Sequence, residues 1–213
     1  MDSRTAMAAD EYFPIVIQTS ASATSGRVVA YSQPSNASGY YESSFEYGLQ
    51  ATLDPSAPTV IRNLMIPYYS SFDLAGGLTA RIYANDGPLV GQSRAPGTLL
   101  SQVVTDINGP GSTTLTIGYG FVTANTLPET ITVTLSFEGI GGDRTAGWVL
   151  STADNVVGTH PEFFWELNAA NEWTRKSLTV IPEPKMSALL GMGGLIVAVL
   201  ASRGGARTPG TGA

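Results

Sequence analysis

The sequence contains no cysteine, few charged side chains and a single histidine. Without cysteine the chain cannot form disulfide bonds, zinc–thiolate sites or iron–sulfur clusters, and it offers no thiol nucleophile. Charged residues make up only 13% of the chain, which is too few for long solvent-exposed helices. The net charge of -6 and the lack of a basic stripe argue against nucleic acid as a partner, because phosphate backbones require clustered Lys and Arg.

Short runs of alternating and β-branched residues dominate the chain, separated by turn signals among its 24 Gly and 13 Pro. The pattern predicts strands over residues 12–18, 27–32, 59–69, 78–84, 98–106, 113–121, 130–138, 147–152 and 173–181. No helical period is convincing before residue 186. We therefore expect an all-β fold, a jelly-roll-like β-sandwich of one domain over residues 12–180, preceded by a disordered segment, residues 1–11.

The clearest strand signal lies in residues 130–137, where apolar and hydroxyl side chains alternate. Side chains of a strand point alternately to opposite faces of a sheet, so the apolar residues share one face and the hydroxyl residues the other. The apolar set is Ile131, Val133, Leu135 and Phe137. The alternation predicts one packed face and one solvated face.

The C-terminal region is built differently, with a Pro182-Glu183-Pro184 triplet, an uncharged stretch from residue 186 to 202, and then Arg203 and Arg207. The prolines end any preceding strand, since they donate no backbone hydrogen bond. A helix over these 17 residues, twelve of them apolar, would be roughly 25 Å long, at the short end of what spans a bilayer. We predict a transmembrane helix there, with the body outside and a basic cytoplasmic tail, residues 203–213. A buried core helix is the alternative.

This order of parts resembles the PEP-CTERM sorting signal of Gram-negative bacteria. The resemblance implies that residues 181–185 form the processing motif, read at Pro182, Glu183 and Pro184, and that Arg203 and Arg207 act as the stop-transfer signal. It also implies two partners, membrane lipid and an exosortase, which is a membrane transpeptidase. The protein would be anchored in the inner membrane and then transferred to the cell surface or extracellular matrix.

Two further features bear on this resemblance. An exported chain should begin with a hydrophobic run, and none is present near Met1, although Ala6-Met7-Ala8 fits a signal-peptidase site. Residues 1–11 are therefore interpreted as a signal-peptide remnant, with chance in an Ala-rich segment as the alternative. In addition, residues 81–88 and 95–100 resemble the β-rich domains of PEP-CTERM proteins, a resemblance that implies no activity.

Catalytic signatures are weak. The one histidine, His160, precedes Pro161 in a predicted loop, and no Gly-x-Ser-x-Gly nucleophile motif is present. A carboxylate pair could perform glycoside hydrolysis, but spacing along a β-rich chain does not show which carboxylates meet. The candidates for such a pair are Glu42, Glu46, Glu129, Glu138, Glu162, Glu166 and Glu172. We predict that the chain is not an enzyme.

Two binding functions stay open. Residues 85–87 and 106–109 combine Asx side chains with glycine turns, so they suit structural calcium as well as ordinary hairpins, and no other cofactor is expected. Aromatic residues gather at 40–47 and again at Trp148, 163–165 and Trp173, which favours either a hydrophobic core or a sugar-stacking platform around Trp165. The sequence thus predicts a non-catalytic exported surface protein. A lectin-like module for exopolysaccharide, anchored at the membrane, is the alternative.

Overall fold

The computed structural model describes residues 12–21, 26–33, 39–58, 60–117, 127–151 and 157–177. Within these ranges the protein is all-β, as the sequence predicted, and every strand pairing is antiparallel. The strands are β1 (Ile15–Ser20), β2 (Val28–Gln33), β3 (Gly39–Tyr41), β4 (Tyr47–Thr52), β5 (Val60–Ser70), β6 (Leu74–Ala84), β7 (Leu89–Val90), β8 (Ser93–Arg94), β9 (Leu99–Ile107), β10 (Gly111–Ile117), β11 (Thr130–Phe137), β12 (Ala146–Leu150), β13 (Phe163–Leu167) and β14 (Trp173–Ser177).

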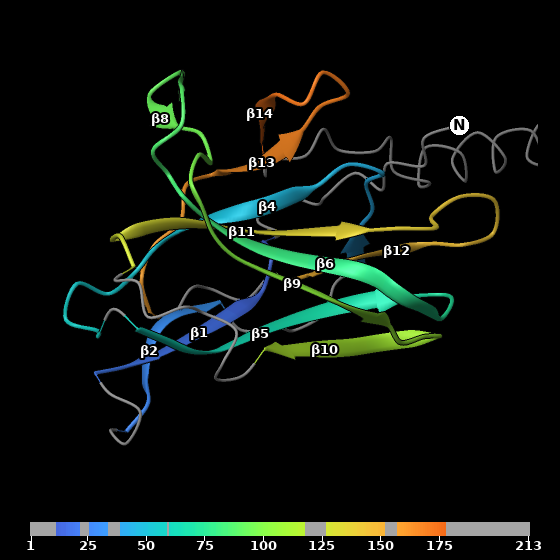
Figure 1. The fold of residues 1–213 in the computed structure, drawn as a ribbon, viewed down its shortest axis with the longest axis horizontal. Coiled ribbons are helices and arrows are strands. Elements are labelled where there is room, and N and C mark those ends of the chain that lie inside the picture. Colours follow the sequence, from blue (N-terminus) through green and yellow to red (C-terminus); the bar gives the residue numbers. More distant parts are fainter. Residues whose placement is uncertain are drawn as a thin grey trace, which may run out of the picture. The chain divides into compact units, whose positions relative to one another are not determined.

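Twelve of these strands form two six-stranded sheets, and β7 and β8 form a separate hairpin (Figure 1). The first sheet has the order β2-β1-β5-β12-β3. β1 and β12 pair with successive parts of one edge of β5, and β10 pairs with its other edge. The second sheet has the order β14-β13-β4-β11-β6-β9. Consecutive strands β5 and β6, β9 and β10, and β11 and β12 lie in different sheets, so the chain crosses repeatedly between the two layers.

The core lies between the sheets, as expected for a β-sandwich, and both sheets contribute to one cluster of buried residues. Phe13 is at its centre, with ring centroids 5.0–5.9 Å from those of four other aromatics. These are Tyr41, Tyr47, Trp148 and Phe164. Full burial of each large side chain contributes about 2–3 kcal/mol, so this cluster accounts for much of the fold's stability without disulfides.

Polar groups inside this aromatic cluster are paired. The Tyr47 hydroxyl donates to the Tyr41 carbonyl at 2.7 Å and accepts the Trp148 amide at 2.8 Å. The Trp148 indole nitrogen donates to the Pro14 carbonyl at 3.0 Å. Burial raises the pKa of Tyr47 well above its ordinary value, so the phenol stays protonated and able to donate.

All nine predicted runs overlap an observed strand, but five strands were missed. The most important is β4, at the centre of the second sheet, where Gly48 and Gln50 weaken the strand signal. At Gly48 the backbones of β4 and β11 approach closely, because an added Cβ atom would lie 2.0 Å from the Val133 carbonyl oxygen. No other residue fits this position without moving a strand.

The prediction of a solvated hydroxyl face on β11 is wrong for two central residues. The apolar residues Ile131, Val133 and Leu135 face the core as expected. On the opposite face, however, Thr132 and Thr134 are also fully buried. Asn85, after β6, contacts Thr132, and Glu46, before β4, contacts Thr134, and alternation within one strand cannot reveal such partners.

By its internal contacts the chain divides into two units, Met1–Val180 and Ile181–Ala213, and every described residue belongs to the first. The predicted transmembrane helix, residues 186–202, and the predicted N-terminal segment, residues 1–11, lie outside the described residues. Within the described part of the chain, no helix has the length and hydrophobicity needed to cross a membrane.

Candidate functional site

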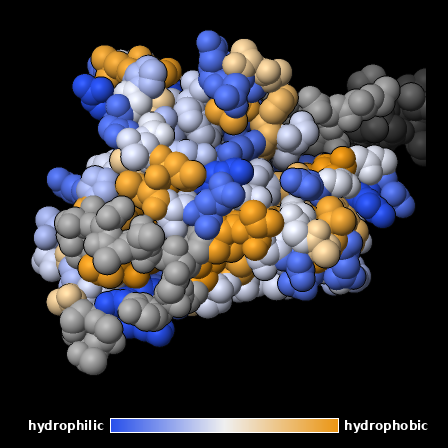
Figure 2. Space-filling model, in the orientation of Figure 1, coloured by the Kyte–Doolittle hydropathy of each residue, from blue (hydrophilic) through white to orange (hydrophobic). Residues whose placement is uncertain are grey.

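The outer face of the second sheet, turned away from the core, carries two networks of polar side chains. β4, β11 and β6 lie side by side in it, and the β7–β8 hairpin lies near β13 (Figure 1). Residues that alternate with the core residues of these strands point to this face. Figure 2 shows hydrophilic and hydrophobic residues interspersed on the visible surface rather than one continuous apolar patch.

A carboxylate, Glu46, organises the middle of this face. Its two oxygens accept hydrogen bonds from Arg81 Nη1 at 2.7 Å, from the Tyr83 hydroxyl at 3.1 Å and from the Thr134 hydroxyl. The Glu46 side chain is only 9% exposed and that of Arg81 is 23% exposed. We call these four residues the Glu46 cluster.

The guanidinium of Arg81 has further partners that fix its orientation. Its Nε donates to Gln102 Oε1 at 2.8 Å, and Nη1 also lies 3.4 Å from the Ser136 hydroxyl. The contacts come from β9, β11 and the residue before β4, so three separate segments of the chain hold one planar group. Gln102 itself is exposed, which leaves the rim of this cluster open to solvent.

A second polar group lies beneath the β7–β8 hairpin. Asn85 Nδ2 donates to Thr132 Oγ1 at 2.9 Å and to Gln50 Oε1 at 3.3 Å. The same Gln50 oxygen accepts the Trp165 indole N–H at 3.1 Å. Ala95 from the loop after β8 packs against Trp165, so this half of the face is closed.

Two aromatic side chains meet where the closed half borders the Glu46 cluster, to which one of them, Tyr83, belongs. The rings of Tyr83 and Trp173 are 5.6 Å apart in a T-shaped arrangement, and both are partly exposed. Their strands, β6 and β14, have three others between them, and strands in a flat sheet are spaced about 4.8 Å apart. The contact therefore indicates that the sheet bends between β14 and β6, so that their side chains meet on this side. Burial raises the pKa of Tyr83, and the Glu46 carboxylate adds to the rise.

The predicted sugar-stacking residue Trp165 cannot perform that role, because it is fully buried. Trp148, Phe163 and Phe164 are buried as well. Sequence reasoning placed Trp173 in the same aromatic group without distinguishing it. The signal that could have separated it is the polar neighbourhood Trp173-Thr174-Arg175-Lys176, which is typical of an edge strand with a solvated side.

A second carboxylate cluster lies at the border of the core. Glu166 is buried, and its Oε2 accepts the Tyr41 hydroxyl at 2.8 Å and the Ser43 hydroxyl at 3.0 Å. Lys176 Nζ lies 3.3 Å from Oε1. Glu46 and Glu166, two of the candidate glycosidase carboxylates, are thus each held by three donors and engaged in structural contacts.

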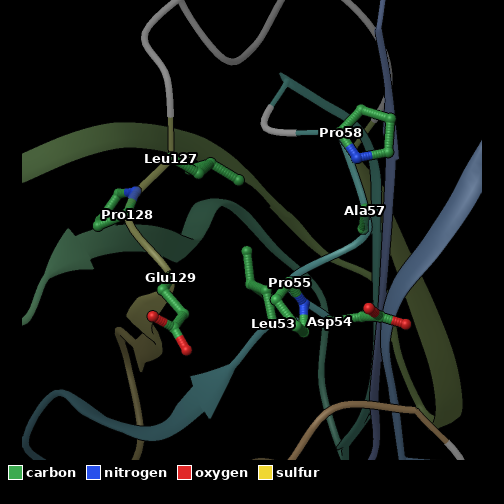
Figure 3. Close-up of a pocket in the computed structure, with 8 residues that line it drawn as sticks. All are labelled: Leu53, Asp54, Pro55, Ala57, Pro58, Leu127, Pro128 and Glu129. Carbon is green, nitrogen blue, oxygen red and sulfur yellow. The ribbon is translucent and has the colours of Figure 1, made fainter.

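A third candidate carboxylate, Glu129, lines a surface hollow of about 200 Å³ together with Asp54. Figure 3 shows the two carboxylates at opposite sides of the hollow, with Leu53 and Pro55 between them. Asp54 is engaged in a turn, where its Oδ1 accepts the Ser56 amide at 2.8 Å and hydroxyl at 2.7 Å. These hydrogen bonds lower the pKa of Asp54. Proline and apolar residues form most of the lining, so the hollow does not assemble an acid–base pair.

His160 packs against the Tyr12 ring, with centroids 4.6 Å apart, and its Nδ1 lies 3.1 Å from the Pro161 carbonyl. Burial lowers the pKa of His160, and the carbonyl contact opposes this shift. The imidazole is therefore neutral at pH 7.

The two segments considered for calcium use their oxygens internally. Asp86 accepts the Thr98 amide at 2.7 Å and its hydroxyl at 2.6 Å, which lowers the pKa of Asp86. Asp106 Oδ1 accepts the Gly76 amide at 2.9 Å. Among the described residues, no three acidic, histidine or cysteine side chains gather as a metal site would require. Calcium therefore stays a sequence-based expectation.

The predicted sorting residues Pro182, Glu183, Pro184, Arg203 and Arg207 lie outside the described residues, so the structure says nothing about their geometry. The structured part of the chain instead presents one candidate surface, the outer face of the second sheet. No protein-family model matches the sequence, and no curated protein and no solved structure matches it.

Proposed function

We propose that the chain is a non-catalytic exported protein whose jelly-roll-like β-sandwich is presented at the cell surface or in the extracellular matrix. The observation that carries this proposal is the C-terminal order of Pro182-Glu183-Pro184, an uncharged apolar stretch and two arginines. In this proposal an exosortase reads the triplet, residues 186–202 hold the chain in the inner membrane as a helix, and Arg203 with Arg207 stops translocation.

The contacts of the acidic side chains support a non-catalytic role. Glu46 and Glu166 each accept three hydrogen bonds or ion-pair contacts from neighbouring side chains. A general acid or base needs access to a substrate proton, and these carboxylates are already occupied. Asp54, the other carboxylate of the hollow that Glu129 lines, accepts hydrogen bonds from Ser56 (Figure 3).

The test is intact mass spectrometry of the protein isolated from its own cells, with fractionation of membrane, surface and medium. We expect the wild-type protein to lose everything after about Pro184 and to leave the membrane. Glu183→Ala should stay in the membrane fraction at full mass, because the triplet loses the single charge available for recognition. Glu172→Ala is the matched control, since it removes an exposed carboxylate from the turn before β14 and leaves the triplet intact.

Either of two outcomes would refute the sorting proposal. A wild-type protein that keeps residues 186–202 at its final location is not processed. A Glu183→Ala protein released at the wild-type rate shows that Glu183 is not read.

Carbohydrate binding is the second candidate function, and the partly exposed Tyr83–Trp173 pair favours it. Amphipathic aromatic rings next to fixed polar groups are typical of sites that bind ligands with alternating apolar and hydroxyl surfaces. This function is compatible with surface presentation, because a matrix protein meets exopolysaccharide. It predicts a saturable glycan ligand, whereas a passive matrix protein predicts none.

A further inference from the structure

We propose that the open half of the outer face of the second sheet binds an uncharged glycan chain, with Trp173 and Tyr83 as the stacking side and Arg81 and Gln102 as the hydrogen-bonding side. The inference rests on the carbohydrate-binding candidate above and adds to it the site and the class of sugar. It does not depend on exosortase sorting.

The aromatic side of the site follows from comparing the three tryptophans of the chain. Trp148 and Trp165 are fully buried, and both indole N–H groups are bonded inside the protein. Trp173 is only partly buried. The Tyr83 ring contacts the Trp173 ring in a T-shaped arrangement, and this contact restricts the orientation of Trp173. Apolar C–H faces of a pyranose ring fit such a surface.

The polar side is fixed before any ligand arrives. Arg81 is held by Glu46, Gln102 and Ser136, so binding does not have to immobilise a free arginine side chain. Gln102 uses its carbonyl oxygen for Arg81 and is exposed, which leaves its amide group at the surface. Amide and guanidinium N–H groups are donors that hydroxyl oxygens of a sugar can accept from.

The charge of the site favours a neutral ligand. The positive charge of Arg81 is cancelled by Glu46 at 2.7 Å. The charged residues around it are mixed in sign rather than uniformly basic. Near the hairpin and β14 they are Arg94, Arg175, Asp86 and Glu172, and beyond the cluster they are Asp106 at β9 and Glu138 after β11. An anionic polysaccharide would meet no net positive field, so charge complementarity selects an uncharged chain.

The opposite side of the molecule provides a natural control. On the outer face of the first sheet, Tyr40 and Tyr69 stack with centroids 4.4 Å apart and an interplanar angle of 21°. Nearly parallel rings at this distance cover each other's faces. The pair therefore has the aromatic content of the proposed site without its arginine and glutamine, and removing one ring should leave glycan binding unchanged.

The test uses the full-length protein in mild detergent with four hexasaccharide probes, cellohexaose, xylohexaose, mannohexaose and, as the charged arm, hexaguluronate. Calorimetry measures the Kd, and acrylamide quenching of fluorescence reports the exposure of Trp173. We expect at least one neutral probe to bind with a Kd of about 1 mM or tighter and to reduce quenching. Raised salt should leave this affinity unchanged, because no net charge is matched.

Four variants separate binding from folding. Trp173→Ala should weaken binding about tenfold, while Trp173→Phe, which keeps a ring, should recover most of the affinity. Gln102→Ala, an exposed substitution that leaves the core intact, should weaken binding about threefold. Tyr69→Ala, on the other sheet, should bind as the wild-type protein does.

Three results would overturn the proposal. Binding by none of the neutral probes removes both this site and the carbohydrate-binding function, while exosortase sorting stands or falls on its own mass measurement. Binding of hexaguluronate alone contradicts the argument from charge. Neutral binding that neither Trp173→Ala nor Gln102→Ala weakens keeps the carbohydrate-binding function and refutes this site.

Discussion

The Glu46 and Glu166 clusters have nearly the same chemistry in two different environments. Each carboxylate accepts from one cationic side chain, one tyrosine and one aliphatic hydroxyl. Glu46 lies on the outer face of the second sheet, where its cation Arg81 has two further partners. Glu166 lies at the border of the core, and Lys176 has its side chain 37% exposed.

The difference shows that the burial of its donors determines how much a carboxylate contributes to stability. Around Glu46 the buried hydroxyl of Thr134 depends on the carboxylate, and solvent cannot replace it. Around Glu166, Lys176 can be hydrated if its partner is lost. The two carboxylates should therefore contribute unequally to the free energy of unfolding, although their donors are similar. The three predictions below test this difference.

The largest effect is expected for Glu46→Ala. Removing this carboxylate leaves the buried Thr134 hydroxyl and the Tyr83 hydroxyl without the acceptor and separates Arg81 from its counterion. We expect the free energy of unfolding to fall by about 3 kcal/mol in urea denaturation. Glu46→Gln keeps the shape and one acceptor oxygen, so it should lose less. Equal losses for the two variants would show that hydrogen-bond acceptance at this position contributes nothing.

An intermediate effect is expected for Glu166→Ala. The Tyr41 hydroxyl loses its acceptor in a buried place, but Lys176 and Ser43 can turn toward water. We expect a loss of about 2 kcal/mol in the same urea titration. A loss larger than that of Glu46→Ala would reverse the comparison. It would mean that the position of a carboxylate near the core affects stability more than the buried hydroxyls that donate to it.

The smallest effects are expected for the two hydroxyl donors. Thr134→Val preserves shape and removes a fully buried donor, so we expect a loss of about 1 kcal/mol. Ser43→Ala removes a partly exposed donor that water can replace, and about 0.5 kcal/mol is expected. Thermal unfolding followed by circular dichroism would rank the two. A Ser43→Ala effect as large as that of Thr134→Val would contradict the role assigned to solvent.

The sequence predicted the fold class and the core face of β11, because those depend on local alternation. It could not predict the Glu46 cluster, since Glu46 contacts Arg81, 35 residues away, and Thr134, 88 residues away. Which carboxylate meets which donor depends on strand order, and strand order is not visible in residue spacing. The prediction of a solvated hydroxyl face on β11 was wrong for the same reason.

The missed strands show the other limit of local signals. The segment of β4 contains Gly48 and Gln50, which lower strand propensity, yet β4 lies between β13 and β11 and is indispensable to the second sheet. The segment of β13, Phe163–Leu167, has an apolar run rather than alternation because both of its faces are covered. Trp173 was named among the aromatics without being distinguished from the fully buried Trp165, although the polar residues that follow it offered a signal.

Gly48 is a position at which the fold is sensitive to substitution. The residue contributes no side chain, yet the main-chain spacing that it permits brings Thr134 to Glu46 on one side and Trp165 to Gln50 on the other. Larger residues elsewhere in β4 can be exchanged for others of similar volume, but position 48 has no near neighbour among the amino acids. Any substitution there would therefore disturb both polar groups at once, although the residue itself touches neither through a side chain.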